Sequence, residues 1–488
     1  MALPLLSKSK YLNGLQCPKL LWKQINESEK IPETDPVTQY IFDQGHLVGE
    51  YAKELFPGGI DLPQDDFMGN IEKTRELLTQ RRPLFEAGIL AGNIYSRVDM
   101  LNPVDGDEWD IIEVKSSTSV KDVHIDDVAF QKFCCEQAGI NINKCHLRHI
   151  NNQYIKDGQI NPGELFIIQD ISENVEEAKR GIYTRVEDMF EIVSAPSCPD
   201  TPVGNHCKDP YECPLTECWN GLPEHNIFTL YWGGKKCGEL YGSGIITINE
   251  IPDSFKLNGK QQIQRLCVTN NECHINNDAI REFLSSLQYP LYYLDFETIG
   301  PAVPIFDGTG PYQDTPFQFS LRTVRDESQE PEHSSFLASS TDDPRPAFLE
   351  ELRKVLGDTG SIIVYHQGFE EGILRKLAQA FPAYDGWIYN LCDRLVDLLA
   401  PFSNFHYYHP LQKGSASLKR VLPAITGSGY EDLIITEGQA ASVAYQAVTY
   451  GDVPEDVRDK VRADLEKYCG RDTEGMIWIV ERLKELCH

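Results

Sequence analysis

The chain has 488 residues, of which 41% are hydrophobic and 24% are charged, and its formal net charge at pH 7 is −29. That length exceeds one ordinary domain core, so we expect two or three domains. No apolar run approaches the roughly 18 residues of a membrane-spanning helix, and the first residues lack the long apolar stretch of a signal peptide. We therefore expect a cytoplasmic protein with no membrane partner. The acidic charge argues against a generally basic nucleic-acid-binding surface and restricts any such contact to a local basic strip.

The segment 96–117 contains two strand-like runs on either side of a turn-rich stretch, which predicts a β-hairpin. Asp99 lies on the first run, and Glu113 and Lys115 lie on the second. Because side chains alternate along a strand, Glu113 and Lys115 share one face. The two carboxylates suit a hard cation such as Mg²⁺, and the lysine would steady the attacking water or a developing phosphate charge. A surface hairpin with ordinary charged residues is the alternative.

The order Asp, hairpin, Glu-x-Lys resembles the PD-(D/E)XK nucleases and, among them, the RecB-like branch. The resemblance implies two further site residues. His46, on an expected amphipathic helix, would complete the metal shell. Gln131, on the helix expected after the Glu-x-Lys strand, would lie near the site as a catalytic residue. From the residues alone, both also fit ordinary positions on a helix.

Three of the 14 cysteines follow a close spacing in a Pro-rich loop, Cys207, Cys213 and Cys218, and Cys17 stands alone near the start. In a large cytosolic chain such cysteines are metal ligands or buried thiols rather than disulfides. Four thiolates suit either a [4Fe-4S] cluster or Zn²⁺. The order of one early and three late cysteines resembles the iron–sulfur staple of AddB-type helicase-nucleases and of CRISPR adaptation nucleases, which implies iron and a structural role. Cys198 is the substitute ligand if one assignment fails.

The stretch 194–223 is dense in Pro, Gly, Asp and Cys and is expected to close a first domain. The sequence thus predicts three parts: a first domain over 1–222, a short helical linker over 223–286 and a second domain over 287–488. Within the linker, residues 240–252 loosely resemble a helix-hairpin-helix element. A plain helical linker is the alternative.

The second domain begins with an apolar and aromatic run over 288–300, expected as a buried strand, that carries Asp295 and Glu297 on one face. Two carboxylates side by side are how a two-metal site gathers its ligands. Strand-like and helix-like segments alternate after it, which predicts an α/β domain.

The later motifs of this domain resemble, in their order, the DnaQ-like exonucleases of the RNase H-like fold. The resemblance makes Glu370 a metal ligand where aspartate is usual, with Glu371 as the fallback, and gives Asp397 a supporting role. Tyr468 and Asp472 form the Y-x3-D arrangement of the DEDDy subgroup, in which Asp472 holds metal and Tyr468 orients the attacking water.

Basic residues interleave with aromatic ones between these motifs, at Lys413, Lys419 and Arg420. Stacking surfaces beside cations suit single-stranded nucleic acid. A packed loop would contain the same residues.

Nearly end to end, the chain resembles a bacterial family that joins a RecB-like nuclease to an RNase H-like domain. That resemblance implies an enzyme that uses Mg²⁺ or Mn²⁺ to hydrolyse phosphodiesters of DNA, with the C-terminal site working from 3′ ends. RNA as substrate is a further alternative. A protein that binds nucleic acid or serves as a scaffold, with one or both sites inactive, is the competing interpretation, and Glu370 and the acidic charge favour it.

Overall fold

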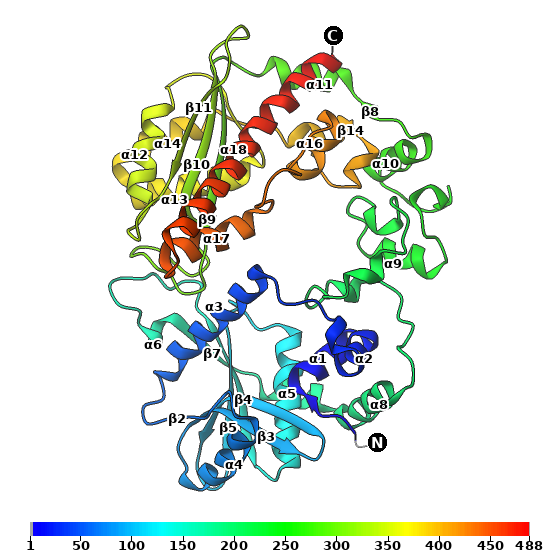
Figure 1. Cartoon of the computed structure of the whole chain (residues 1–488), viewed down its shortest axis with the longest axis vertical. Coiled ribbons are helices and arrows are strands. Elements are labelled where there is room, and N and C mark those ends of the chain that lie inside the picture. The colour runs from blue at the N-terminus through cyan, green and yellow to red at the C-terminus, as the bar shows by residue number, and fades with distance from the viewer. Residues whose placement is uncertain (1–2, 488) are drawn as a thin grey trace. The chain divides into compact units, whose positions relative to one another are not determined.

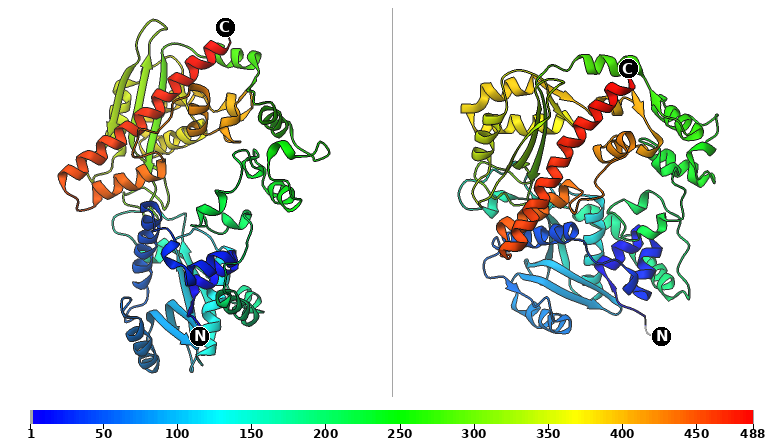
Figure 2. Two further views of the ribbon diagram at one scale, coloured as in Figure 1. Left: turned by 45° about the vertical axis from the view of Figure 1, so that its right-hand side comes forward. Right: turned by 45° about the horizontal axis from the view of Figure 1, so that its top comes forward.

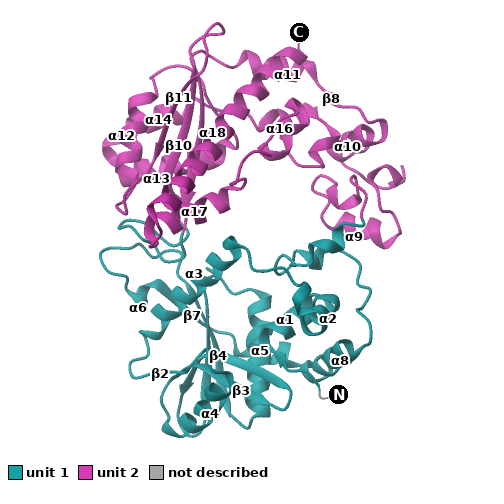
Figure 3. Cartoon of the chain, viewed as in Figure 1, with its two compact units in different colours: residues 1–221, 301–312 teal, residues 222–300, 313–488 magenta. Residues whose placement is uncertain are grey.

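The computed structural model describes residues 3–487, and the chain forms two compact units (Figures 1 and 3). The first consists of residues 1–221 and 301–312, and the second of residues 222–300 and 313–488. Residues 223–286, expected as a linker, are thus grouped with the second unit. The short segment 301–312, which follows a strand of the second unit in sequence, is grouped with the first because its apolar residues Ala302 and Val303 pack into a core there.

The first unit is built on one mixed sheet with the strand order β2-β3-β4-β5-β6-β7, to which β1 adds beside β4. Neighbours β3 and β4, β4 and β5, and β6 and β7 are antiparallel, whereas β5 and β6 are parallel. The strands are β1 Leu6–Ser7, β2 Ile60–Asp61, β3 Leu84–Ala91, β4 Ile94–Pro103, β5 Trp109–Lys115, β6 Ile142–Ile150 and β7 Phe166–Asp170. The pairing of β4 with β5 confirms the predicted hairpin.

Two helices of this unit carry the residues of interest. In α3, Asp35 caps the first turn by accepting hydrogen bonds from the backbone of Val37 and Thr38, and Pro36 occupies the first helical position. Helix α5 packs into the main core through Val128, Ala129 and Phe130. The helices are α1 Lys8–Gln16, α2 Pro18–Asn26, α3 Pro36–Lys53, α4 Phe67–Leu77, α5 Asp122–Gln137, α6 Pro162–Leu165, α7 Ser172–Lys179 and α8 Ile182–Ser194.

The second unit has a five-stranded sheet in the order β11-β10-β9-β12-β13. Strand β9 lies at its centre, antiparallel to β10 and parallel to β12, and β13 continues the parallel side. The strands are β9 Leu291–Ile299, β10 Thr315–Val324, β11 Glu332–Leu337, β12 Ile362–Val364 and β13 Leu395–Asp397, with β8 His274–Ile275 and β14 Tyr407–Tyr408 paired separately. The chain is therefore a mixed α/β protein, as predicted.

Helices cover both faces of this sheet (Figure 2). Alternate residues of β9, Leu294 and Phe296 among them, pack with α12, α13 and α14, and the long helix α18 contacts β9 and β10. The helices are α9 Lys235–Gly242, α10 Gly259–Asn270, α11 Asn277–Ser285, α12 Arg345–Val355, α13 Gln367–Ala380, α14 Asp385–Cys392, α15 Ala400–Ser403, α16 Leu418–Thr426, α17 Gly438–Tyr450 and α18 Glu455–Leu486. Over residues 3–487, no helix is both long and apolar enough to span a bilayer.

The segment that resembles a helix-hairpin-helix does not form two helices. After α9 ends, residues Ile248–Glu250 form a single turn of 3-10 helix. Thr247 and Glu250 cap that turn reciprocally, and Pro252 follows it. A capped turn with a proline two residues later cannot extend, so the second helix of the motif is missing here.

Candidate metal centres

The first candidate centre is a cluster of three carboxylates in the first unit, Asp99 of β4, Glu113 of β5 and Asp127 of α5. Lys115 joins two of them, because its Nζ donates to Glu113 Oε1 at 2.6 Å and to Asp127 Oδ2 at 2.7 Å. Gln131 joins the same two, with Nε2 donating to Glu113 Oε2 at 2.6 Å and to Asp127 Oδ1 at 2.8 Å. The structure thus places four residues expected from the sequence, Asp99, Glu113, Lys115 and Gln131, at one site.

Two members of this centre were missed by the sequence analysis. Asp127 precedes Gln131 by four residues on α5, so the two share a helical face, and that spacing was a usable signal. Lys8, the first residue of α1, gave no such signal. Its Nζ lies 3.0 Å from Glu113 Oε1, 3.4 Å from Asp127 Oδ1 and 4.0 Å from Asp99 Oδ1.

The charges of this centre perturb one another strongly. Burial, followed by the charges of Asp127 and Asp99, raises the pKa of Glu113 to about 7. Burial also raises the pKa of Asp99. Although burial acts to raise the pKa of Asp127, the ammonium groups of Lys115 and Lys8 hold that pKa well below its usual range. Three carboxylates against two ammonium groups leave a concentration of negative charge in a buried place, which favours an added cation.

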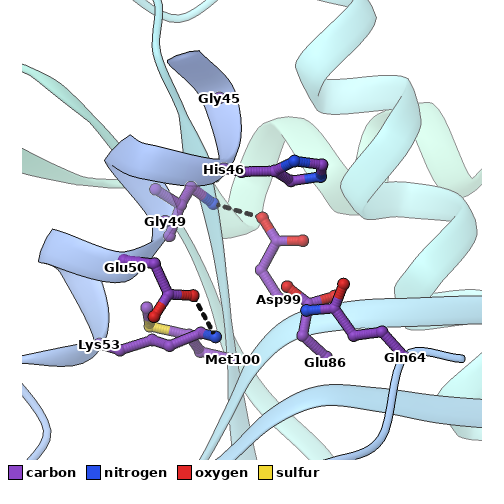
Figure 4. A pocket seen from close by; sticks show the side chains of 10 residues that line it. Gly45, His46, Gly49, Glu50, Lys53, Gln64, Glu86, Asp99 and Met100 are labelled. Carbon is purple, nitrogen blue, oxygen red and sulfur yellow. Dashed lines mark hydrogen bonds and ion pairs between the residues drawn. The ribbon is translucent and has the colours of Figure 1, made fainter. Parts of the chain in front are cut away.

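A pocket of about 320 Å³ opens beside Asp99 (Figure 4). His46 lines it from α3, and its ring lies on the same side of the pocket as the Asp99 carboxylate. Glu86 of β3 lines it as well, with a backbone φ of 58° that a non-glycine residue rarely adopts. Its Oε2 lies 3.1 Å from Arg97 Nε, and burial raises its pKa. Glu86 is a further carboxylate at this pocket that the sequence analysis missed, since nothing in the sequence marks its backbone conformation.

The four expected cluster cysteines gather at one end of the first unit. Cys17 is buried at the junction of α1 and α2 and packs with Leu20 and Leu215, against which Cys213 and Cys218 also lie. Cys207 joins them because the backbone N–H of Cys213 donates to its carbonyl at 2.8 Å. Gln16, just before Cys17, donates to the carbonyls of His206 and Tyr211 in the same loop at 2.8 and 2.7 Å.

The second candidate centre lies on β9 and α18 of the second unit. Asp295 and Glu297 leave β9 on the face opposite the apolar side chains of Leu294 and Phe296, as strand alternation predicts. Asp472 of α18 is buried and accepts a short hydrogen bond from the hydroxyl of Tyr430. Burial raises the pKa of Asp472 to about 6, while Tyr430 and Lys419 act in the other direction. Burial, with Asp295 and Asp472 adding to it, raises the pKa of Glu297 well above its ordinary value.

The two glutamates at the start of α13 occupy different environments. Glu370 is 2% exposed, and its Oε2 has no hydrogen-bond partner within residues 3–487. Burial and the neighbouring charge of Asp295 raise its pKa to about 9. Glu371 instead pairs with Arg375 at the surface, at 2.6 Å. Glu370 is therefore the member of the pair that faces the centre.

Of the other two residues expected at this centre, Tyr468 lies beside it and Asp397 holds the surrounding backbone. Tyr468 is buried, and a Cβ placed on Gly438 would lie 3.8 Å from its hydroxyl and 3.6 Å from Glu297 Oε2, so these two groups are neighbours. Asp397 is structural, because its Oδ1 accepts from the backbone N–H of His366 and of Leu399 at 3.0 and 2.9 Å.

The three basic residues expected to bind nucleic acid have different surroundings. Lys419 lies 5.1 Å above the ring of Tyr468 and pairs with Glu437 at 2.9 Å. Lys413 pairs with Glu224 at 2.9 Å, and Arg420 is exposed on α16. Only Lys419 is adjacent to the second centre among these three.

Comparison with known proteins finds one family model and two relatives that are similar to parts of this chain. A model described as "Domain of unknown function (DUF2779)" matches residues 292–417, which include α13 and all of β9 but its first residue. A protein of Mycoplasma pneumoniae named "Uncharacterized protein MG366 homolog" is 26% identical over 213 residues, 40% of this chain and 32% of the relative. "Uncharacterized protein MG366" of Mycoplasma genitalium is 25% identical over 214 residues, again 40% of this chain and 32% of the relative. The chain thus spans about a third of the length of these relatives.

Proposed function

We propose that the chain is a nuclease with two sites, each dependent on Mg²⁺ or Mn²⁺, that hydrolyses phosphodiesters of DNA in the cytoplasm. The observation that carries the proposal is the pair of buried carboxylate clusters, one in each unit. Buried carboxylates repel one another and are costly without a compensating cation. In the proposal, each cluster would hold the metals of its unit.

For the first unit, the order β3, β4, β5, α5, β6, with an antiparallel triplet followed by a parallel strand, supports a PD-(D/E)XK assignment. The donors present fit a hard divalent cation, because Asp99, Glu113 and Asp127 offer only carboxylate oxygens. His46 would complete the set from α3. A cation bound there would supply a hydroxide nucleophile and neutralise charge on the phosphate.

The lysines of this site have distinct tasks in the proposal. Lys115 is fixed by two hydrogen bonds, to Glu113 and to Asp127, so its ammonium is held where it can steady the developing negative charge. Gln131 fixes the orientation of the same two carboxylates. Lys8 adds a second positive charge from α1 and balances the cluster.

For the second unit, the strand order β11-β10-β9-β12-β13 with two antiparallel and two parallel pairings supports an RNase H-like, DEDDy exonuclease assignment. The unpartnered Glu370 Oε2 supports the presence of a cation at this site, because a buried acceptor without a donor is otherwise unfavourable. Asp295, Glu297, Glu370 and Asp472 would hold metal, and Tyr468 would orient the attacking water. We expect hydrolysis from 3′ ends, with Lys419 next to the phosphate backbone.

The four-cysteine cluster would hold a [4Fe-4S] centre, with Zn²⁺ as the alternative. Its role is structural. Cys17 and the loop that carries the other three cysteines lie about 190 residues apart in sequence, so a bound centre ties the two ends of the unit and lowers the entropy of the unfolded chain.

Degradation of end-labelled single-stranded DNA, with RNA of the same sequence in parallel, tests the proposal. Asp99→Asn should remove one metal-dependent activity, and Asp295→Asn should remove the other. Matched controls are Asp105→Asn in the turn between β4 and β5 and Glu371→Gln on α13, which should retain both activities. If the double variant degrades the strand as the parent does, the assignment is wrong.

The second candidate function is a nucleic-acid-binding protein without turnover, which the replacement of the usual aspartate by Glu370 favours. It would retain the labelled strand in Mg²⁺ or Mn²⁺ and release no product over hours.

A further inference from the structure

The second centre contains a sulfur atom that the proposed function does not use. Cys469 follows Tyr468 on α18 and precedes Asp472 by three residues, so its side chain shares the helical face that meets β9. Its thiol is fully buried and donates to Asp295 Oδ2 at an Sγ to oxygen distance of 3.4 Å. One atom each from Asp295, Glu297 and Cys469 lie within 4.8 Å of one another.

The spacing of these atoms matches a tetrahedral site. Zn²⁺ binds thiolate sulfur at about 2.3 Å and carboxylate oxygen at about 2.0 Å, and tetrahedral angles then separate sulfur from oxygen by about 3.5 Å. The observed separation of Cys469 Sγ from Asp295 Oδ2 is 3.4 Å. The separation of this sulfur and this oxygen is therefore compatible with two ligand positions of a zinc site.

A second observation points to a ligand at the same place. The buried Glu370 Oε2 has no hydrogen-bond partner among the described residues. It lies close enough to Asp295 for that carboxylate to raise the pKa of Glu370. An acceptor in this position is available as a further oxygen ligand. Asp295 itself is only partly buried, whereas Cys469 is fully buried.

We propose that Cys469, Asp295 and Glu297 form a binding site for a soft or borderline divalent cation, Zn²⁺ in particular, within the second centre. On binding, the thiol proton of Cys469 is released to solvent and the sulfur coordinates as thiolate. Mg²⁺ prefers oxygen ligands and does not use this sulfur. Zn²⁺ therefore competes for Asp295 and Glu297 against the cation that supports hydrolysis, so the site is inhibited by Zn²⁺. Only this last consequence rests on the proposed nuclease function.

The binding test uses the full chain with its four-cysteine cluster intact, so that the thiolates of that cluster contribute the same background to every variant. Cd²⁺ is titrated into the parent, into Cys469→Ser and into Cys392→Ser, and the ultraviolet sulfur-to-metal charge-transfer band is recorded. Cys392 is a matched control because it is another buried thiol of the second unit, on α14. We expect the band in the parent and in Cys392→Ser and its loss in Cys469→Ser. Zn²⁺ affinity, measured by competition with a chromophoric chelator, should fall about tenfold or more only in Cys469→Ser.

A measurement on the parent protein avoids any folding defect of the variants. Slow thiol alkylation followed by peptide mass spectrometry should show that Zn²⁺, and not Mg²⁺, protects the peptide that contains Cys469. Equal labelling with and without Zn²⁺, or equal Cd²⁺ spectra in the parent and Cys469→Ser, would overturn the proposal. If the protein hydrolyses no nucleic acid but shows the Cd²⁺ band and the protection, the nuclease proposal fails and the zinc site stands. If it hydrolyses DNA and shows neither, the zinc site alone fails.

Discussion

Replacement of Lys8 by methionine should tighten the binding of Mn²⁺ at the first centre while it lowers hydrolysis there. The ammonium of Lys8 lies among the three carboxylates that the cation would bind, so an entering cation must displace it. Methionine keeps most of the length and the apolar stem of the side chain and removes the charge.

The distances set the size of the effect. At 3.0 Å from Glu113 and 4.0 Å from Asp99, the Coulomb attraction of Lys8 is about 1.4 and about 1.0 kcal/mol even at the dielectric constant of water. The side chain of Lys8 is only 22% exposed, so water-like screening gives a lower limit. Since about 1.4 kcal/mol corresponds to a tenfold change in affinity, we expect Mn²⁺ to bind at least about ten times more tightly.

The assay is the electron paramagnetic resonance signal of free Mn²⁺, measured in an Asp295→Asn background that silences the second centre. Lys10→Met is the matched control, because Lys10 lies two residues along α1 and its Nζ donates to the carbonyl of Leu5 instead. Lys10→Met should leave the affinity unchanged. Unchanged or weaker Mn²⁺ binding by Lys8→Met would refute the idea that Lys8 competes with the cation.

Three further outcomes are expected. Glu370→Gln should lower 3′-end hydrolysis by at least about tenfold. Glu371→Gln should leave hydrolysis unchanged, since Glu371 is paired with Arg375. Equal losses in the two variants would contradict the placement of Glu370 alone at the second centre. Burial lowers the pKa of His124 from about 6.5 to about 4. As the pH falls, His124 is therefore protonated in the unfolded chain before it is protonated in the folded chain. The free energy of unfolding should therefore fall as pH drops from about 6.5 to 4, and His124→Gln should flatten that slope in denaturant titrations. Anaerobically purified parent should be brown with about four irons per chain. Cys207→Ser should lose the iron and melt at a lower temperature, whereas Cys198→Ser should keep the iron and the melting temperature of the parent. A colourless, zinc-rich parent would show that the four cysteines hold Zn²⁺ instead of an iron–sulfur cluster.

Local periodicity determined much of both centres from the sequence. Strand alternation is enough to put Glu113 beside Lys115 and Asp295 beside Glu297, because the backbone geometry of a strand fixes which side chains share a face. Helical spacing does the same for Tyr468 and Asp472 on α18. These relations depend on neighbours within a few residues, so they can be predicted without knowledge of the rest of the chain.

Only the tertiary structure decided what meets these faces. Lys8 contacts Glu113 from 105 positions away, and Cys469 contacts Asp295 from 174 positions away. Neither pairing leaves a spacing in the sequence, because each depends on how a helix packs against a sheet that is completed much later or earlier in the chain. The half-buried Glu371 and the buried Glu370 are adjacent in sequence, and the packing of α13 alone separates their roles.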